Sequence, residues 1–113
     1  GVKVALVGAV AAGSLVLSTG NAFADGLGGD AYTANCHAWV NADGAHYGYG
    51  IVDGLSGCMV NLWQYNVITR GSVGTGFYYD HTYSKYHADG VHYLQVEIWD
   101  PYTGVNSWGS LVY

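Results

Sequence analysis

From residue 25 onward the chain consists of short runs in which apolar and polar residues alternate, separated by glycine and aspartate. Alternation with a period of two is typical of strands with two different faces, and no run shows the period of a helix. We therefore predict an all-β fold, a small antiparallel β-sandwich or partly closed barrel. The expected strands lie near residues 32–42, 45–53, 58–67, 73–82, 84–88, 91–100 and 105–113.

Two Asp-Gly pairs lie between strand-like runs, at Asp43-Gly44 and Asp89-Gly90. Both fit two-residue type I′ hairpin turns. The sequence around them is repeated, because ADGAHY at 42–47 is echoed by ADGVHY at 88–93. This repeat suggests two duplicated three-stranded units packed face to face. The alternative is that any two hairpins of this composition look alike.

Residues 1–24 carry no charge except Lys3, are mostly apolar, and end in Ala22-Phe23-Ala24. These are the features of a secretory signal peptide, with a mature protein beginning at Asp25. We then expect a flexible start at 25–31 and a β-domain over 32–113. The alternative is a retained apolar helix that anchors the domain in a membrane or packs in a pilin-like filament.

Export would place the domain in an oxidising, extracellular setting. The chain holds two cysteines, Cys36 and Cys58, which we expect to pair there in a disulfide. The fixed charges are three Lys or Arg against eight Asp or Glu, a formal net charge of −5. So few basic residues cannot form the positive surface that nucleic acid or an anionic membrane needs, so neither is an expected partner.

Catalytic and metal-binding patterns are weak. The chain has no Gly-x-Ser-x-Gly motif. Ser84 near His81 and Asp80 is a local grouping of the right residue types, but sequence neighbours on a strand point to alternate faces and cannot form a triad by themselves. Alternation also puts Glu97 beside Tyr93 and Trp99, where we interpret it as a charge at the rim of a face. We predict neither an enzyme nor a cofactor.

Five histidines make a metal site worth testing. A turn at 89–90 would place His87 opposite His92, so these two are weak metal candidates. Zinc needs three or four ligands, and exposed hairpin histidines without a metal are the alternative that we favour.

Aromatic residues give the strongest functional signal, with 11 Tyr and 4 Trp. We expect Trp63, Trp99 and Trp108 to pack in the core. Tyr47, Tyr49, Tyr78 and Tyr93 are the predicted contact residues of an exposed face, because aromatic rings flanked by Asn, Gln and Asp bind sugar rings or protein partners.

The leader, the glycine-rich start and the Tyr-rich domain together resemble small secreted proteins of actinobacteria. Residues 83–87 (YSKYH) resemble part of the lactococcin-like secreted bacteriocins, and the paired β-units resemble βγ-crystallin-like secreted proteins. No functional residue is carried over from these resemblances.

The sequence thus predicts a secreted, non-enzymatic binding or adaptor protein for an extracellular protein partner or a cell-surface glycan. An antibacterial toxin and a filament or membrane-anchored subunit are the alternatives.

Overall fold

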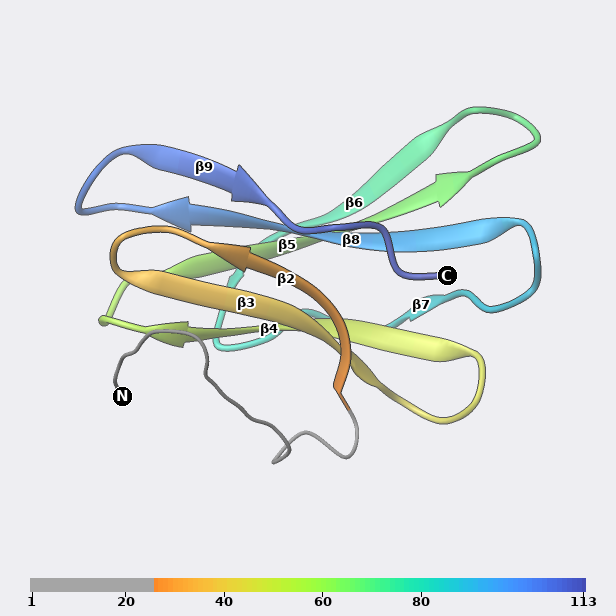
Figure 1. Ribbon diagram of the computed structural model, residues 1–113, viewed down its shortest axis with the longest axis horizontal. Helices are drawn as coiled ribbons and strands as arrows, with labels where there is room; N and C mark the ends of the chain where they lie inside the picture. The colour runs from red at the N-terminus through yellow and green to blue at the C-terminus, as the bar shows by residue number, and fades with distance from the viewer. Residues whose placement is uncertain (1–25) are drawn as a thin grey trace.

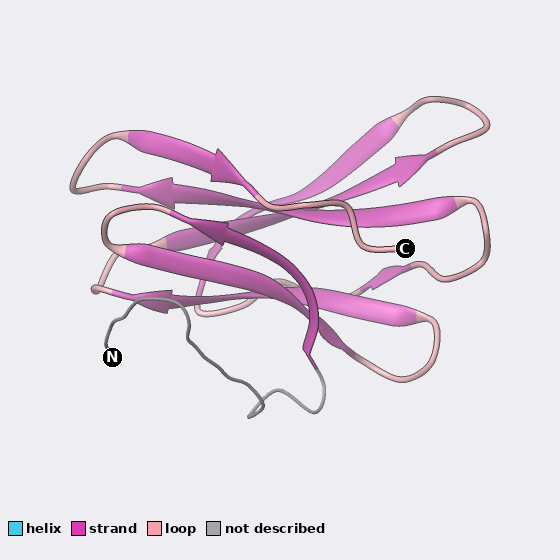
Figure 2. Ribbon diagram, viewed as in Figure 1, coloured by secondary structure: helices cyan, strands magenta, loops and turns pink. Residues whose placement is uncertain are grey.

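The computed structural model describes residues 26–113, and the fold is all-β, as predicted (Figures 1 and 2). The predicted signal peptide at 1–24, the retained-helix alternative and the mature start at Asp25 lie outside these residues. The regular structure of residues 26–113 is all strand, so that part of the chain contains no helix able to cross a membrane.

Two antiparallel sheets of four strands each pack face to face. The β3–β4 sheet has the order β2-β3-β4-β7, with β2 (Gly26–Tyr32), β3 (Cys36–Ala42), β4 (Tyr47–Gly54) and β7 (Lys85–Tyr86). The β5–β8 sheet has the order β6-β5-β8-β9, with β5 (Met59–Asn66), β6 (Ser72–Tyr79), β8 (His92–Asp100) and β9 (Val105–Trp108).

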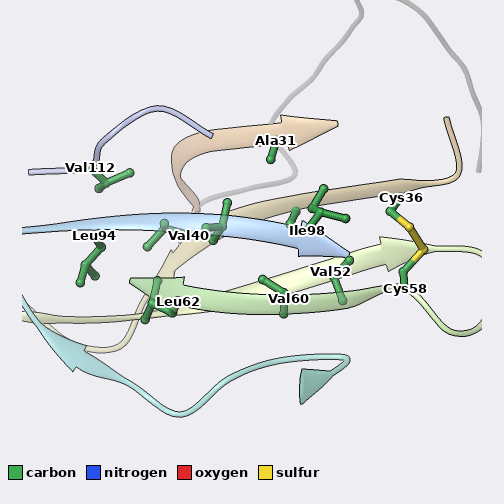
Figure 3. Close-up of a cluster of buried hydrophobic side chains, with 12 residues drawn as sticks. Ala31, Cys36, Val40, Val52, Cys58, Val60, Leu62, Leu94, Ile98 and Val112 are labelled. Carbon is green, nitrogen blue, oxygen red and sulfur yellow. A yellow bond between two sulfur atoms is a disulfide. The ribbon is translucent and has the colours of Figure 1, made fainter. Parts of the chain in front are cut away.

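The core is filled by alternate side chains of the central strands (Figure 3). The fully buried ones are Ala38 and Val40 of β3, Val60 and Leu62 of β5, and Leu94, Val96 and Ile98 of β8. Each large aliphatic side chain contributes about 1.5–3 kcal/mol when removed from water. The core-facing positions of β4 include two glycines, because a Cβ at Gly48 would lie 2.9 Å from Leu94 Cδ1 and one at Gly50 would lie 3.1 Å from Val60 Cγ2.

The predicted Cys36–Cys58 disulfide is confirmed. It joins the start of β3 in one sheet to the residue before β5 in the other, at one end of the core (Figure 3). Closing a loop with a sequence separation of 22 residues stabilises the fold by about 3 kcal/mol in the chain-entropy account.

A buried carboxylate reinforces the same end of the sandwich. Asp100, the last residue of β8, accepts hydrogen bonds from Thr33 Oγ1 at 2.8 Å, Asn35 N at 3.2 Å and Tyr102 N at 2.9 Å. Burial acts to raise the pKa of Asp100, but the hydrogen bonds from Thr33, Tyr102 and Asn35 outweigh it and lower this pKa below its ordinary value.

Most of the segment that we expected to be a flexible start, residues 25–31, lies in a strand. Gly26–Tyr32 forms β2, which pairs antiparallel with β3. The turn at 33–35 separates the two strands, with Thr33 N donating to Cys36 O at 2.9 Å. Gly28 and Gly29 have φ values of 84° and 67°, and the register with β3 shifts around them. Such bulges interrupt the alternation by which a strand is recognised in a sequence.

The connection at Asp43-Gly44 is longer than the predicted two-residue turn. Ala42 pairs with Gly48, and Asp43 N donates to Tyr47 O at 2.8 Å. The longer loop shifts the register of the two strands, so Asn41 lies opposite Tyr49 and not opposite His46.

Asp89-Gly90 is not a hairpin turn either. The strand before it, β7, pairs with β4, whereas β8 pairs with β5, so the chain crosses between the sheets here. Asp89 Oδ1 accepts hydrogen bonds from Val91 N at 2.8 Å and His92 N at 2.7 Å, which stabilises a bend in place of a hairpin. The two echoed segments therefore occupy different positions in the fold.

The predicted strand 73–82 is also divided between the sheets. β6 ends at Tyr79, and Asp80 has a φ of 67° that turns the chain toward β4. His81 then forms a bridge with Ile51, and Gly50 N donates to Thr82 Oγ1 at 2.9 Å.

Candidate binding face

The outer face of the β5–β8 sheet is built by the side chains that alternate with the core. On β5, Val60 and Leu62 point into the core, so Asn61, Trp63 and Tyr65 point outward. On β8 the outward positions are Tyr93, Gln95, Glu97 and Trp99. Two ladders of aromatic and polar side chains therefore stand side by side.

The antiparallel register aligns these ladders across the two strands. Asn61 lies opposite Glu97, Trp63 opposite Gln95, and Tyr65 opposite Tyr93. Residues directly opposite each other in such a pair have Cβ atoms about 4.5–5.5 Å apart, so their side chains contact.

The edge strands extend the same surface. Trp108 of β9 lies opposite Glu97, and on the other edge Phe77 and Tyr79 of β6 lie opposite Asn61 and Met59. Trp108 is 52% exposed and Tyr79 is 67% exposed. We call this surface the aromatic face, defined by Trp63, Tyr65, Phe77, Tyr79, Tyr93, Trp99 and Trp108.

Hydrogen bonds fix the rings at the centre of the aromatic face. Trp63 Nε1 donates to Glu97 Oε1 at 2.9 Å, and the Tyr65 hydroxyl donates to Gln95 Oε1 at 2.7 Å. Gln95 Nε2 in turn donates to Gly109 O at 2.7 Å. Rings held in this way lose little further side-chain entropy when a ligand packs on them.

A glycine on β6 makes room for the central indole. A Cβ at Gly74 would lie 3.2 Å from Trp63 Cε3 and 2.9 Å from Asn61 Oδ1. β6 carries a register shift here, and Gly76 N and Thr75 Oγ1 both donate to Asn61 Oδ1, at 3.1 Å and 3.4 Å. The bulge therefore holds both Asn61 and the ring of Trp63 in place.

Two expectations about this surface are wrong. Trp63, Trp99 and Trp108 do not lie in the core, because alternation puts them on the outer side of the sheet. Glu97 is not a rim charge, since it is only 7% exposed and lies among Asn61, Trp63 and Asn106. The alternation of β8 puts Glu97 on the correct side of the strand, but it does not show that Asn61, Trp63 and Asn106 contact Glu97 there.

The four predicted contact tyrosines do not form one surface. Tyr93 belongs to the aromatic face, and its ring meets that of Tyr113 edge to face with centroids 5.2 Å apart. Tyr78 is an exposed residue of edge strand β6 and contacts Tyr83. Tyr47 and Tyr49 lie on β4, on the outside of the opposite sheet, where Tyr49 accepts a hydrogen bond from Asn41 Nδ2 at 3.3 Å.

The opposite sheet has a smaller aromatic row. Tyr32 stacks on His37 with ring centroids 4.4 Å apart, and His37 meets Trp39 at 4.7 Å. Trp39 also lines a shallow hollow with Gly26, Gly28 and Asp30. His37 Nε2 lies 2.6 Å from Asp30 Oδ2, so the imidazole of this row already has a polar partner within the protein.

The geometry that made His87 and His92 metal candidates is absent. His87 is buried and its Nδ1 lies 3.0 Å from the backbone oxygen of Tyr113, while His92 Nδ1 lies 2.6 Å from Asp89 Oδ2. Desolvation acts to raise the pKa of Asp89, but hydrogen bonds from His92 and Val91 and the charge of His92 lower it well below its usual range. Within residues 26–113 no three His, Cys, Asp or Glu side chains gather as metal ligands.

The Asp80, His81 and Ser84 grouping also separates. Ser84 Oγ donates to Asp43 Oδ2 at 2.5 Å, whereas His81 Nδ1 lies 2.8 Å from Asp80 Oδ2. The hydroxyl and the imidazole thus have different partners.

The fold and the aromatic face together define a small disulfide-linked β-sandwich with a preformed aromatic surface. No protein-family model, curated protein or solved structure matches the chain.

Proposed function

We propose that this chain is a secreted, non-enzymatic glycan-binding protein whose ligand lies along the aromatic face. The observation that carries the proposal is the ordered group of tryptophan and tyrosine rings on the outside of the β5–β8 sheet, fixed from below by Glu97 and Gln95. A ring in an aromatic surface offers an apolar face, and a sugar ring offers a face of C–H groups that packs on it.

Polar side chains between the rings support a glycan over a purely apolar ligand. Asn106, paired with Trp99 across β8 and β9, is exposed and its amide lies beside Glu97. Gln95 lies between Trp63 and the backbone of Gly109. Amides interleaved with rings match the hydroxyl groups that surround a sugar ring. A row of rings over several strands suits an extended chain of sugars.

The disulfide supports the proposed location. A cystine that ties the two sheets together persists in oxidising compartments and is rare in the cytosol. Together with the leader expected at 1–24, it favours an extracellular place of action.

The test compares two variants with matched exposure. Trp108→Ala removes a ring that is 52% exposed on the aromatic face, and Tyr47→Ala removes one that is 47% exposed on the opposite sheet. Affinity for neutral β-1,4-linked oligosaccharides, measured by calorimetry, should fall about tenfold or more for Trp108→Ala, because such a loss corresponds to about 1.4 kcal/mol of ring contact. Tyr47→Ala should stay within about twofold of the parent protein. Equal losses in both variants would contradict the proposal.

A protein partner is the second candidate, and one observation favours it. The connection between β5 and β6 extends away from the other sheet (Figure 1), and Ile68 there is 73% exposed. An aliphatic side chain at the end of a projecting hairpin is suited to a pocket on another protein. Loss of partner binding in Ile68→Asp, with glycan affinity unchanged, would identify this second surface.

A further inference from the structure

Glu97 is a buried acid whose polar contacts are all neutral. Its Oε1 accepts hydrogen bonds from Asn61 Nδ2 at 3.2 Å and Trp63 Nε1 at 2.9 Å, and its Oε2 accepts one from Asn106 Nδ2 at 2.9 Å. The ion pairs within residues 26–113 join histidine to Asp30, Asp80 or Asp89, and none includes Glu97. No basic side chain within residues 26–113 therefore pairs with this carboxylate.

Three tryptophans lie on the same side of the sheet as this carboxylate. Trp108 lies directly opposite Glu97 on β9, Trp63 donates to it from β5, and Trp99 follows two residues later on the same side of β8. The face of an indole ring attracts cations, and the attraction strengthens when the cation is partly removed from water. A carboxylate without a basic partner, on a sheet face that also carries three tryptophans, is suited to a positively charged group.

The charge of the whole chain acts in the same direction. Eight acidic residues against three basic ones give a formal net charge of −5, and Arg70 and Lys85 are the fixed cations within residues 26–113. An acidic protein attracts a polycation at a distance, most strongly at low ionic strength.

We propose that the ligand of the aromatic face is a cationic glycan, an amino-sugar chain with free, protonated amino groups, and that Glu97 with the neighbouring tryptophans is the ammonium subsite. This inference rests on the proposed glycan-binding function and specifies its ligand. Ring stacking holds the sugar chain, and the carboxylate selects chains that carry positive charge.

The test uses two oligosaccharides of equal length, a β-1,4-linked glucosamine hexamer and its fully N-acetylated form. We expect the parent protein to bind the cationic hexamer at least tenfold more tightly at low salt, with a smaller ratio as salt is added. Glu97→Gln keeps the shape and the acceptor for Trp63 while removing the charge, and the exposed amide of Asn106 can turn to suit it. This variant should lose most of the preference and bind the acetylated hexamer within about twofold of the parent.

Asp53→Asn is the matched control, because it removes one exposed carboxylate from the opposite sheet. It should leave the preference unchanged. If Glu97→Gln keeps the full preference, or if Asp53→Asn loses as much of it, the ammonium subsite is wrong and net charge alone is responsible.

The parent protein alone separates the two proposals, even if Glu97→Gln fails to fold. If the parent protein binds both hexamers equally, the cationic ligand is wrong. If Trp108→Ala then weakens the binding of both, the glycan-binding function still holds. Binding of neither hexamer would overturn the cationic ligand. If, in addition, no neutral oligosaccharide is bound, the glycan-binding function is overturned as well.

Discussion

At the scale of single residues, Asp100 makes the most far-reaching polar contacts. Its carboxylate binds Thr33 and Asn35, which lie 67 and 65 residues earlier in the chain. We expect Asp100→Asn to lower the free energy of unfolding at pH 7 by about 1–3 kcal/mol, because hydrogen bonds to a buried charged acceptor are lost. Urea unfolding followed by tryptophan fluorescence measures the difference, with Asp53→Asn as the exposed control.

The lowered pKa of Asp100 also determines how its contribution to the free energy of unfolding changes with pH. The pKa of Asp100 is lowered in the folded state from its ordinary value of 3.8. A lowered pKa contributes stability that is complete above 3.8 and is lost as the pH falls through the folded-state value. The difference in free energy of unfolding between the parent protein and Asp100→Asn should therefore become smaller below pH 3.8. If this difference in free energy of unfolding grows on acidification, the proposed role of the Asp100 carboxylate is wrong.

Glu97 and the tryptophans show what alternation reveals about a residue and what it does not. The pattern of β8 correctly separated Leu94, Val96 and Ile98 from Glu97 and Trp99. It did not reveal that Asn61 and Trp63, more than 30 residues earlier, would cover Glu97. The side of a strand is a local property, whereas burial depends on strands that are distant in the sequence.

At the scale of elements, the backbone of β2 comes very close to the segment after β9. A Cβ at Gly109 would overlap the backbone oxygen of Gly29, so the two backbones touch. Gly109 N also donates to Val96 O at 3.0 Å, which holds this segment against β8. We expect Gly109→Ala to force the backbones apart and to destabilise the protein by at least the 1–3 kcal/mol typical of overpacking.

The denaturation midpoint of Gly109→Ala should be compared with that of Gly71→Ala. A Cβ at Gly71 would come no closer than 3.4 Å to Thr69 Oγ1, which is an ordinary contact. Similar midpoints for the two variants would show that β2 does not close the sandwich against the C-terminal segment.

The strands themselves were more predictable than their connections. The expected ranges 58–67 and 91–100 match β5 (Met59–Asn66) and β8 (His92–Asp100) closely. The connections at 43–46 and 87–91 differ from the predicted turns. Asp-Gly favours a bend both in a loop between paired strands and in a crossover between sheets, and tertiary packing decides which strand is the partner. β2 was missed because its glycine bulges break the alternation.

At the scale of the whole molecule, the sandwich presents two outer surfaces of different character. One is the aromatic face, where the rings are held by Glu97 and Gln95. The other carries Tyr47, Tyr49 and the Tyr32–His37–Trp39 row. The sequence predicted an aromatic binding surface, but its tyrosine candidates fell on both sheets because strand order cannot be read from alternation.

Whether a glycan lies on the aromatic face can be tested by NMR titration of the tryptophan indole N–H signals. The chain has four tryptophans, three of them on the aromatic face and one, Trp39, on the opposite sheet. On addition of the glucosamine hexamer, we expect the signals of Trp63, Trp99 and Trp108 to shift in a saturable way while that of Trp39 stays in place. A shift confined to Trp39, or no shift of the other three, would show that the hexamer does not bind the aromatic face.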